Sequence, residues 1–291
     1  MLFKLIVLLL LAPVADAYVA EIAKWRADRE ARLKSESGWT TVVGLHWLEQ
    51  GENSVGSSPK SAVVLPLPAP EKVGTITLSG KMAAFVADER ATVTSKGKPV
   101  TTATLTEDVP LEVGSITFYV IERGSRIGVR VRDKNAETRR SFRGLRWYDI
   151  DERWRIKARL EPPPKGRTVP IGTIVGDTID LESAGYLVFT VNGREVRLEA
   201  LYETPEHEEL YLIFKDRTNG DTTYGAGRYM YPPLPVNGVV DLDFNKAYNP
   251  PCAYTAFATC PLPPRQNWLP VPVTAGEKAY DVPSTRPKAE G

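Results

Sequence analysis

The stretch YLVFTVNGREVRLEALYE, residues 186–203, decides the fold. A β-branched and aromatic run precedes Asn192-Gly193, and apolar side chains alternate with polar ones over residues 195–200 after it. Asn-Gly between two alternating runs is the strongest short-range signal for a β-hairpin, because both residues tolerate the positive φ of a type I′ turn. The stretch therefore predicts two antiparallel strands joined by a two-residue turn.

The same arrangement recurs along the chain after residue 60. Short β-branched and aromatic runs are separated by turn dipeptides, and no apolar pattern of helical spacing and useful length follows residue 50. These features predict an all-β protein whose antiparallel sheets form a sandwich or a barrel-like structure. The further turn dipeptides are Ser79-Gly80, Gly124-Ser125, Asn219-Gly220 and Asn237-Gly238.

The amino-terminal region is different, because residues 19–35 carry an amphipathic helical pattern. Ile22, Trp25 and Leu33 recur at spacings of three and four with Arg29 in the same register, and charged residues fill the other positions. We expect this helix to dock on the body of the protein. The whole chain then divides into a signal peptide (1–17), a helix with an aromatic connecting segment (18–55), a first β subdomain (56–135), a second β subdomain with a proline-rich cover (136–280) and a disordered tail (281–291).

Residues 1–17, MLFKLIVLLLLAPVADA, predict a cleavable signal peptide. A lysine precedes an apolar run over residues 5–11, and Ala15 and Ala17 form the A-x-A arrangement that signal peptidase requires. The alternative is a membrane anchor, but the run falls short of the roughly 20 residues that a spanning helix needs. We therefore expect a periplasmic or extracellular protein with no transmembrane segment after cleavage.

Charge is balanced overall and uneven locally. The chain has 37 basic and 36 acidic residues, a net charge of +1, which argues against a nucleic-acid partner. Residues 121–167, however, hold fifteen basic against seven acidic residues. In 127–132 and 154–160, apolar residues alternate with Arg or Lys. We expect either a solvated sheet face whose cations, such as Arg155 and Arg159, pair with Glu195 and Glu199, or an anion-binding face.

The proline-rich segment contains ten prolines between Pro232 and Pro272. Their density removes backbone donors and predicts an extended cover rather than a helix or a central strand. Cys252 and Cys260 lie within it, eight positions apart. In an exported chain this spacing predicts a local disulfide worth about 2.5 kcal/mol, with a redox pair or a metal pair as alternatives.

Catalytic candidates are few, because the chain has only two His and two Cys. Asp241, Asp243 and Asn245 would share one face of a strand, as the two carboxylates of a glycosidase do. A calcium loop fits poorly, since its sixth and twelfth positions fall on Lys246 and Cys252. We therefore expect no metal and no cofactor. Acid-base candidates are Asp243, Glu277 and His46.

Three motifs resemble the bacterial family known as domain of unknown function 1684. They are GLHWLEQGENSVGSSPKSAVVLP (44–66), DRTNGDTTYGAGRY (216–229) and LDFNKAYNPPCAYTAFATCPLPPRQNWLPVPVTAGEK (242–278). The family pattern reads DFN-x-AYNPPCA, ATCPLPP, N-x-L and AGEK, with Trp268 standing here where an Arg is usual. The resemblance implies no established reaction, cofactor or catalytic residue. Residues 50–66 also resemble the glycine-bearing hairpin of forkhead-associated sandwiches, with Ser57 where a phosphothreonine reader carries Arg.

These observations favour an exported cell-envelope protein that binds a small polar, anionic or glycan ligand. The alternatives are a hydrolase that uses an Asp/Glu acid-base pair and a structural envelope protein without a ligand. A polar pocket would favour binding or catalysis over the structural alternative. The oligomeric state is left open. The predicted ligand-binding residues are Arg228, Asp243, Asn245, Tyr248, Asn249 and Glu277.

Overall fold

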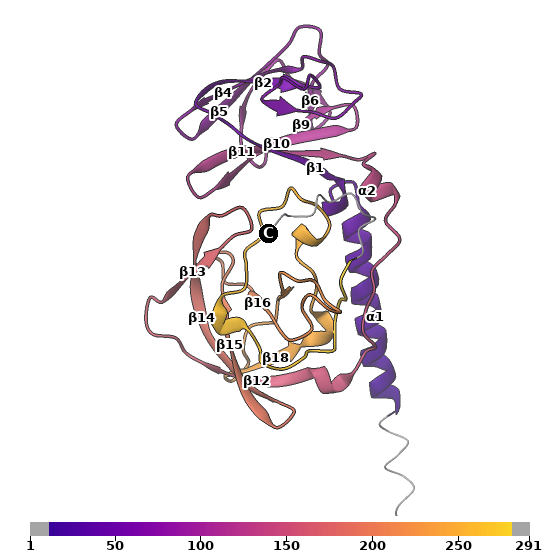
Figure 1. Cartoon of the computed structure of the whole chain (residues 1–291), viewed down its shortest axis with the longest axis vertical. Coiled ribbons are helices and arrows are strands. Elements are labelled where there is room, and N and C mark those ends of the chain that lie inside the picture. Colours follow the sequence, from indigo (N-terminus) through magenta and orange to yellow (C-terminus); the bar gives the residue numbers. More distant parts are fainter. Residues whose placement is uncertain (1–11, 281–291) are drawn as a thin grey trace, which may run out of the picture. The chain divides into compact units, whose positions relative to one another are not determined.

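The computed structural model describes residues 12–280. Residues 1–11 of the predicted signal peptide and the predicted tail 281–291 lie outside this range. Helix α1 (Ala12–Lys34) opens the described chain, and the regular structure that follows consists mostly of antiparallel β-sheets (Figure 1). The prediction of an all-β fold with an amino-terminal helix is confirmed.

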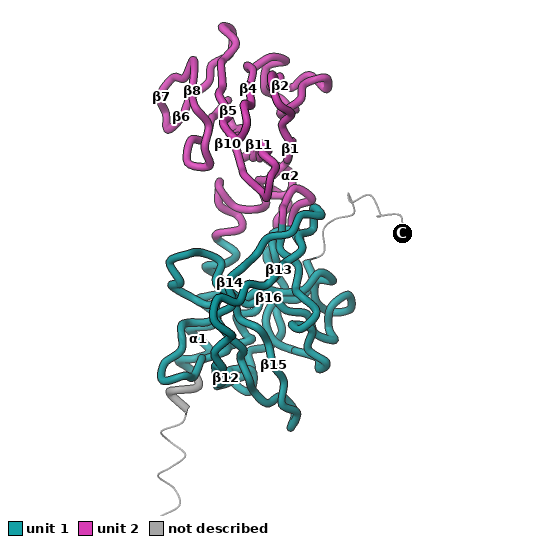
Figure 2. Tube along the Cα trace, turned by 90° about the vertical axis from the view of Figure 1, so that its left-hand side faces the viewer, with its two compact units in different colours: residues 1–31, 144–253, 260–291 teal, residues 32–143, 254–259 magenta. Residues whose placement is uncertain are grey.

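The chain forms two compact units, each discontinuous in sequence (Figure 2). Among the described residues, unit 1 holds 12–31, 144–253 and 260–280, and unit 2 holds 32–143 and 254–259. Unit 1 therefore contains most of α1, the hairpin of residues 186–203 and nearly all of the proline-rich segment.

Unit 2 contains two sheets that share one hydrophobic core. Phe85 and Phe118 lie one on each sheet and meet edge to face, with ring centroids 5.8 Å apart. The first sheet has the order β1 (Val42–Trp47), β11 (Arg126–Asp133), β10 (Ile116–Arg123), β9 (Leu111–Val113), β6 (Thr94–Ser95) and β7 (Lys98–Pro99). The second has the order β3 (Val63–Val64), β2 (Gly51–Gly56), β4 (Gly74–Ser79), β5 (Met82–Ala87) and β8 (Thr102–Leu105). A short helix, α2 (Glu137–Arg140), follows these sheets in the chain.

Unit 1 is organised around a five-stranded sheet. Its strands follow the order β13 (Thr168–Gly172), β14 (Thr178–Val191), β12 (Arg155–Glu161) and β18 (Val239–Asp243), and β15 (Arg194–Leu201) also pairs with β14. Strands β16 (Leu212–Phe214) and β17 (Arg228–Met230) form a separate pair. The predicted hairpin of residues 186–203 is confirmed as β14–β15, with φ of 52° at Asn192 and 76° at Gly193.

The proline-rich segment covers the core of unit 1. After β18 the described chain contains only three single-turn helices: η3 (Phe244–Lys246), η4 (Pro251–Ala253) and η5 (Arg265–Asn267). Leu269, Val271, Val273 and Ala275 are nevertheless buried in the same hydrophobic cluster as the sheet. Burial of these side chains therefore holds the segment in place. Its prolines cannot donate to a regular ladder of hydrogen bonds, and the segment forms the extended cover that the sequence predicts.

Three of the other predicted turns are confirmed and one is wrong. Ser79-Gly80 and Gly124-Ser125 lie at the turns of the β4–β5 and β10–β11 hairpins, and Asn237-Gly238 lies between the bridged residues 236 and 239. Asn219-Gly220 instead belongs to a closed loop. There the Asn219 side chain accepts a hydrogen bond from the backbone N–H of Asp216 at 2.6 Å and donates one to the Tyr224 carbonyl at 2.7 Å. The asparagine shapes its own loop and does not join two strands.

Candidate functional site

A cavity of about 220 Å³ lies in unit 1, between the edge of the five-stranded sheet and the end of β17. Helix α1, strands β12 and β18 and the turn η3 contribute the polar side chains, and residues 230–233 contribute an apolar wall. The lining residues are Glu21, Arg155, Met230, Tyr231, Pro232, Pro233, Asp241, Asp243 and Lys246.

The pairing of β12 with β18 sets the polar side of this cavity. Arg155 Nη2 lies 2.7 Å from Asp241 Oδ2, and Lys157 Nζ lies 3.2 Å from the same oxygen. Lys246 Nζ lies 2.7 Å from Glu21 Oε1. The hydrogen bonds from Arg155 hold the pKa of Asp241 below its ordinary value, and the hydrogen bond from Lys246 lowers the pKa of Glu21. Both carboxylates are therefore ionised at neutral pH, and each cation of the wall already has a counter-charge.

Asp243 is the buried carboxylate of the cavity, and it accepts several hydrogen bonds. Asp243 is 8% exposed, and both of its carboxylate oxygens accept from the Tyr18 hydroxyl at 3.0 Å. Asp243 also ends β18 and caps η3 by accepting from the Asn245 backbone N–H at 3.0 Å. Burial, followed by the nearby Asp243 charge, raises the pKa of Tyr18, so that hydroxyl remains a donor.

The apolar wall is held by a stack of tyrosines. The Tyr231 ring stacks on Tyr211 with centroids 5.2 Å apart and on Tyr248 with centroids 6.3 Å apart. Its hydroxyl donates to the Glu203 carboxylate, and burial raises its pKa. Pro232 and Pro233 follow directly and have no backbone donor. The wall is therefore a rigid, largely apolar surface that faces the ion pairs of β12 and β18.

A second cluster of predicted site residues lies around Glu277, which is completely buried. Glu277 Oε2 accepts from Arg29 Nε at 2.8 Å, and Glu277 Oε1 accepts from Asn249 Nδ2 at 2.7 Å. The Arg29 guanidinium lies 4.1 Å above the centre of the Tyr248 ring. The sequence did not identify Arg29 as the partner of Glu277. The spacing of Arg29 from Trp25 and Leu33 did, however, place it on the inward face of the predicted helix.

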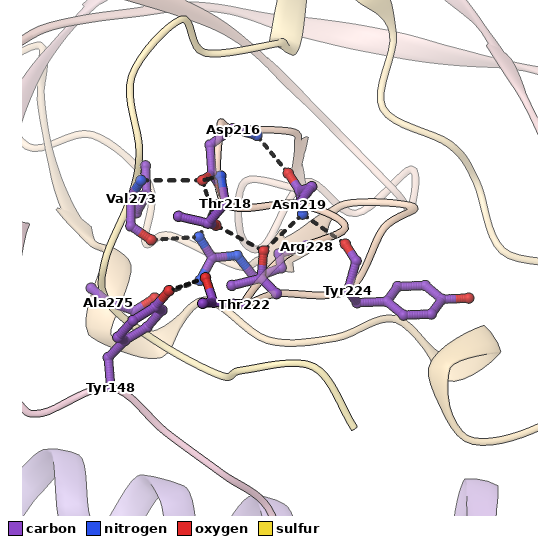
Figure 3. Close-up of polar contacts among 10 residues, drawn as sticks. Tyr148, Asp216, Thr218, Asn219, Thr222, Tyr224, Arg228, Val273 and Ala275 are labelled. Atoms are coloured by element: carbon purple, nitrogen blue, oxygen red, sulfur yellow. Dashed lines mark hydrogen bonds and ion pairs between the residues drawn. The ribbon is translucent and has the colours of Figure 1, made fainter. Parts of the chain in front are cut away.

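Arg228 belongs to a third network and is also completely buried (Figure 3). Its guanidinium donates to Asp216 Oδ2 at 2.7 Å, to the Val273 carbonyl at 2.9 Å and to the Ala275 carbonyl at 2.5 Å. Asp216 in turn accepts from the Val273 backbone N–H at 3.1 Å. The motif of residues 216–229 thus forms a loop with an ion pair between its first residue, Asp216, and Arg228. Hydrogen bonds between this pair and the backbone of Val273 and Ala275 hold the proline-rich cover.

The six predicted ligand-binding residues therefore lie in three separate clusters. Asp243 and Asn245 share one. Asn249 and Glu277 share another, which Tyr248 joins through the contact of its ring with the Arg29 guanidinium, and Arg228 lies in the third. Of the six, only Asp243 lines the cavity. Among the acid-base candidates, Glu277 is enclosed by its own network, and His46 lies on β1 of unit 2, where burial lowers its pKa.

The cationic face of β12 is paired as expected, though with other partners than those predicted. Arg155 pairs with Asp241, and both Arg159 and Arg197 pair with Glu161, at 2.5 and 3.3 Å. Of the two predicted partners, Glu199 is buried and bound by Arg167 at 2.5 Å. The partners thus come from β18 and from β12 itself, because the β12–β18 pairing could not be read from the sequence.

Cys252 and Cys260 are both buried and are thiols in this structure. The Cys252 backbone N–H donates to Cys260 Sγ at 3.1 Å. The hydrogen bond with the Cys252 thiol and burial together raise the pKa of Cys260. The two side chains are therefore neighbours, and the disulfide between them stays a prediction.

Residues 12–280 contain neither a metal-binding cluster of His, Cys, Asp or Glu side chains nor a membrane-spanning helix. No group of three or more His, Cys, Asp or Glu side chains in that range is arranged to hold a metal ion. No helix in the same range is long and apolar enough to cross a membrane.

Comparison with known proteins yields one family and a few solved structures. The family model described as "Protein of unknown function (DUF1684)" matches residues 140–278. The solution NMR structure of an uncharacterized protein of Haloarcula marismortui is 32% identical, with a TM-score of 0.40, over 48% of this chain and 78% of that protein. The FhaA FHA domain in complex with the intracellular domain of Rv3910 is 15% identical, with a TM-score of 0.23, over 30% of this chain and 96% of that domain. No curated protein matches the sequence.

Proposed function

We propose a ligand-binding function for this chain, which belongs to the DUF1684 family: it is an exported protein that binds a neutral, hydroxyl-rich ligand such as a sugar residue. The observation that carries the proposal is the cavity in unit 1, where ion pairs face a rigid wall of Tyr231 and two prolines. Ligand sites combine an apolar surface with a few fixed polar groups in this way.

The charges of the cavity favour a neutral ligand over an anionic one. Its lining holds two cations, Arg155 and Lys246, and three carboxylates, Glu21, Asp241 and Asp243. The cations are bound by carboxylates, and Lys157 adds a further positive charge beside Asp241. An anion would have to displace one of these internal partners, whereas a hydroxyl group can donate to a carboxylate that keeps its ion pair. The cavity therefore favours a polyol over a phosphate or a carboxylate.

The dimensions favour a small ligand. The volume of about 220 Å³ lies below the roughly 300–1,000 Å³ of sites that enclose drug-sized molecules. One ring of a saccharide could lie against the apolar wall that residues 230–233 contribute to the cavity. A hydrolase that uses Asp243 with Glu277 is not favoured, because Glu277 is enclosed by Arg29 and Asn249 and does not line the cavity.

Export is part of the proposal, and the contacts of α1 support it. Asp16 and Ala17 are exposed, whereas Tyr18, the first residue after the predicted cleavage point, is 6% exposed and bound to Asp243. Cleavage after Ala17 would therefore keep every contact that Tyr18 makes through its side chain. Amino-terminal sequencing of the exported protein should begin at Tyr18, and a chain that retains residues 1–17 would contradict export by this route.

The binding test uses calorimetric titration of the full chain with neutral mono- and disaccharides. Arg155→Gln should weaken saccharide binding about tenfold or more, since it removes a charged donor from the cavity. Arg153→Gln is the matched control, because Arg153 forms a similar bidentate pair with Asp151 on the same unit but does not line the cavity. Absence of saturable binding by every saccharide, or equal effects of the two variants, would overturn the proposal.

A further inference from the structure

A group of three arginines on β10 and β11 of unit 2 has too few counter-charges. Arg123 and Arg130 share the Thr259 hydroxyl, and Arg132 and Arg130 share the Tyr119 hydroxyl. The register places Tyr119 opposite Arg130 on the neighbouring strand, so these side chains share one face of the sheet. We name this group of five residues the arginine cluster.

Arg130 lies at the centre of the arginine cluster, and its buried guanidinium lacks a negatively charged partner among residues 12–280. The residue is 4% exposed, and its buried Nε has no hydrogen-bond partner among residues 12–280. Its Nη2 makes one long contact with Thr259 Oγ1, at 3.4 Å, and its guanidinium lies 5.0 Å from the centre of the Trp39 ring. No carboxylate in the described part of the chain forms an ion pair with it. A buried cation without a counter-charge is costly, and proteins rarely retain one.

The neighbours of Arg130 add positive charge rather than remove it. Arg132 donates to the carbonyl of Gly38 at 2.9 Å and to the Tyr119 hydroxyl at 3.1 Å, and within residues 12–280 it has no acidic partner. Arg123 has one, since its Nη1 lies 3.2 Å from Glu107 Oε1. Three guanidinium charges against one carboxylate leave two positive charges unbalanced.

The cluster also consists almost entirely of donors. Thr259 Oγ1 accepts from Arg123 at 3.0 Å and from Arg130, and the Tyr119 hydroxyl accepts from Arg132. Neither hydroxyl proton has an acceptor among the described residues. Two hydroxyl protons and an unused guanidinium N–H can therefore be offered to one group that accepts hydrogen bonds and carries negative charge.

We propose that the arginine cluster binds a phosphoryl group, as free phosphate or as a phosphate monoester. Such a group carries close to two negative charges at pH 7 and three strong acceptor oxygens, which match the charge excess and the donors. Arginine presents its donors in a fixed fork that suits phosphate oxygens. Arg123 and Arg132 are only partly buried, so the group can be approached past their side chains.

The test is titration of the full chain with inorganic phosphate, glycerol phosphate and acetate at constant ionic strength, followed by calorimetry. Phosphate should bind saturably and more tightly than the monoanion acetate. Arg130→Gln should weaken phosphate binding about tenfold or more, and Thr259→Val should weaken it to a smaller extent. Arg90→Gln is the control, because Arg90 is an exposed residue of unit 2 that pairs with Asp88. Tighter binding of glycerol phosphate than of phosphate would identify a monoester as the ligand, and the reverse would identify free phosphate.

Thermal unfolding separates this binding role from a purely structural one. Without phosphate, Arg130→Gln should unfold at the same temperature as the wild type or a higher one, because it removes an uncompensated buried charge. With phosphate, the wild type should be the more stable protein. The proposal would be overturned by equal phosphate affinity of wild type and Arg130→Gln, by equal affinity for acetate and phosphate, by absence of saturable phosphate binding, or by a lower unfolding temperature of the variant without phosphate.

Discussion

Replacing Glu277 by Gln should destabilise unit 1 strongly. Glu277 is completely buried, and its pair with Arg29 Nε spans 2.8 Å. The amide keeps an acceptor for Asn249 Nδ2 but removes the counter-charge of a guanidinium that is itself 8% exposed. Breaking one side of a buried ion pair typically costs about 3–5 kcal/mol. For a domain of this size, each kcal/mol lowers the unfolding temperature by about 2–4 °C, so a fall of roughly 6–20 °C is expected.

The assay is thermal and urea unfolding followed by near-ultraviolet circular dichroism, with two comparison variants. Glu161→Gln removes a partly exposed partner of Arg159 and Arg197 in the same unit, and it should cost about 1 kcal/mol or less. Arg29→Met combined with Glu277→Gln should recover much of the lost stability, since no unpaired charge is left. A loss below about 1 kcal/mol for Glu277→Gln, or a double variant less stable than the single one, would refute the assignment of Glu277 to a structural ion pair.

Three other substitutions or measurements test separate parts of the structure. Gly276→Ala should destabilise the protein far more than Gly193→Ala. Both glycines have positive φ, but only at Gly276 would a Cβ atom lie 2.5 Å from a carbonyl oxygen. Urea unfolding measures the two free energies of unfolding, and equal losses of stability would contradict the prediction. Burial lowers the pKa of His46 below 6.5, so the folded state takes up its proton at lower pH than the unfolded state. The stability of unit 2 should therefore fall as the pH drops from about 7.5 to about 5, less so in His46→Gln, and an identical pH dependence of the two proteins would be the contrary result. Mass spectrometry of the exported protein under non-reducing conditions should find Cys252 and Cys260 resistant to alkylation, and two alkylated thiols would exclude the disulfide.

The sequence predicted those features of the fold that depend on near neighbours. The hairpins at Asn192-Gly193 and Gly124-Ser125 follow from the positive φ of Asn192, Gly193 and Gly124 and from the strand-forming runs beside these turns. The link between Asp243 and Asn245 was also predictable, because the carboxylate lies only two positions before the backbone N–H that it caps. Turn geometry and capping act over a few positions, and a sequence displays such positions side by side.

Most of the candidate site could not be predicted, because its partners are distant in the chain. Arg29 and Glu277 are separated by 248 positions, and Tyr18 and Asp243 by 225. Their side chains meet only after α1 has docked on unit 1, which no local pattern specifies. The sequence therefore predicts a ligand-site role for Glu277, whereas in the structure its carboxylate pairs with Arg29 of α1.

Strands β11 and β12 show why alternation alone does not identify a binding surface. Both alternate apolar residues with cations, and for both the sequence left open a solvated cationic face or an anion-binding face. On β12 the cations lie at an exposed surface and pair with Asp241 and Glu161. On β11, Arg130 is buried and has no carboxylate partner in the described chain. Burial, which depends on what covers a face, thus decides whether an identical pattern gives a solvated surface or a candidate anion site.

The motifs that identify the family specify mainly the scaffold. In residues 242–278, Asn249 and Glu277 bind the helix α1 through Arg29, and Val273 and Ala275 fasten the cover to Arg228. Only Asp243 and Lys246 of this motif line the cavity, and its other lining residues come from α1, β12, β18 and the segment 230–233. A ligand could therefore differ between proteins that share the motif of residues 242–278, since seven of the nine lining residues lie outside that motif, although all of them except Glu21 lie within the family match over residues 140–278.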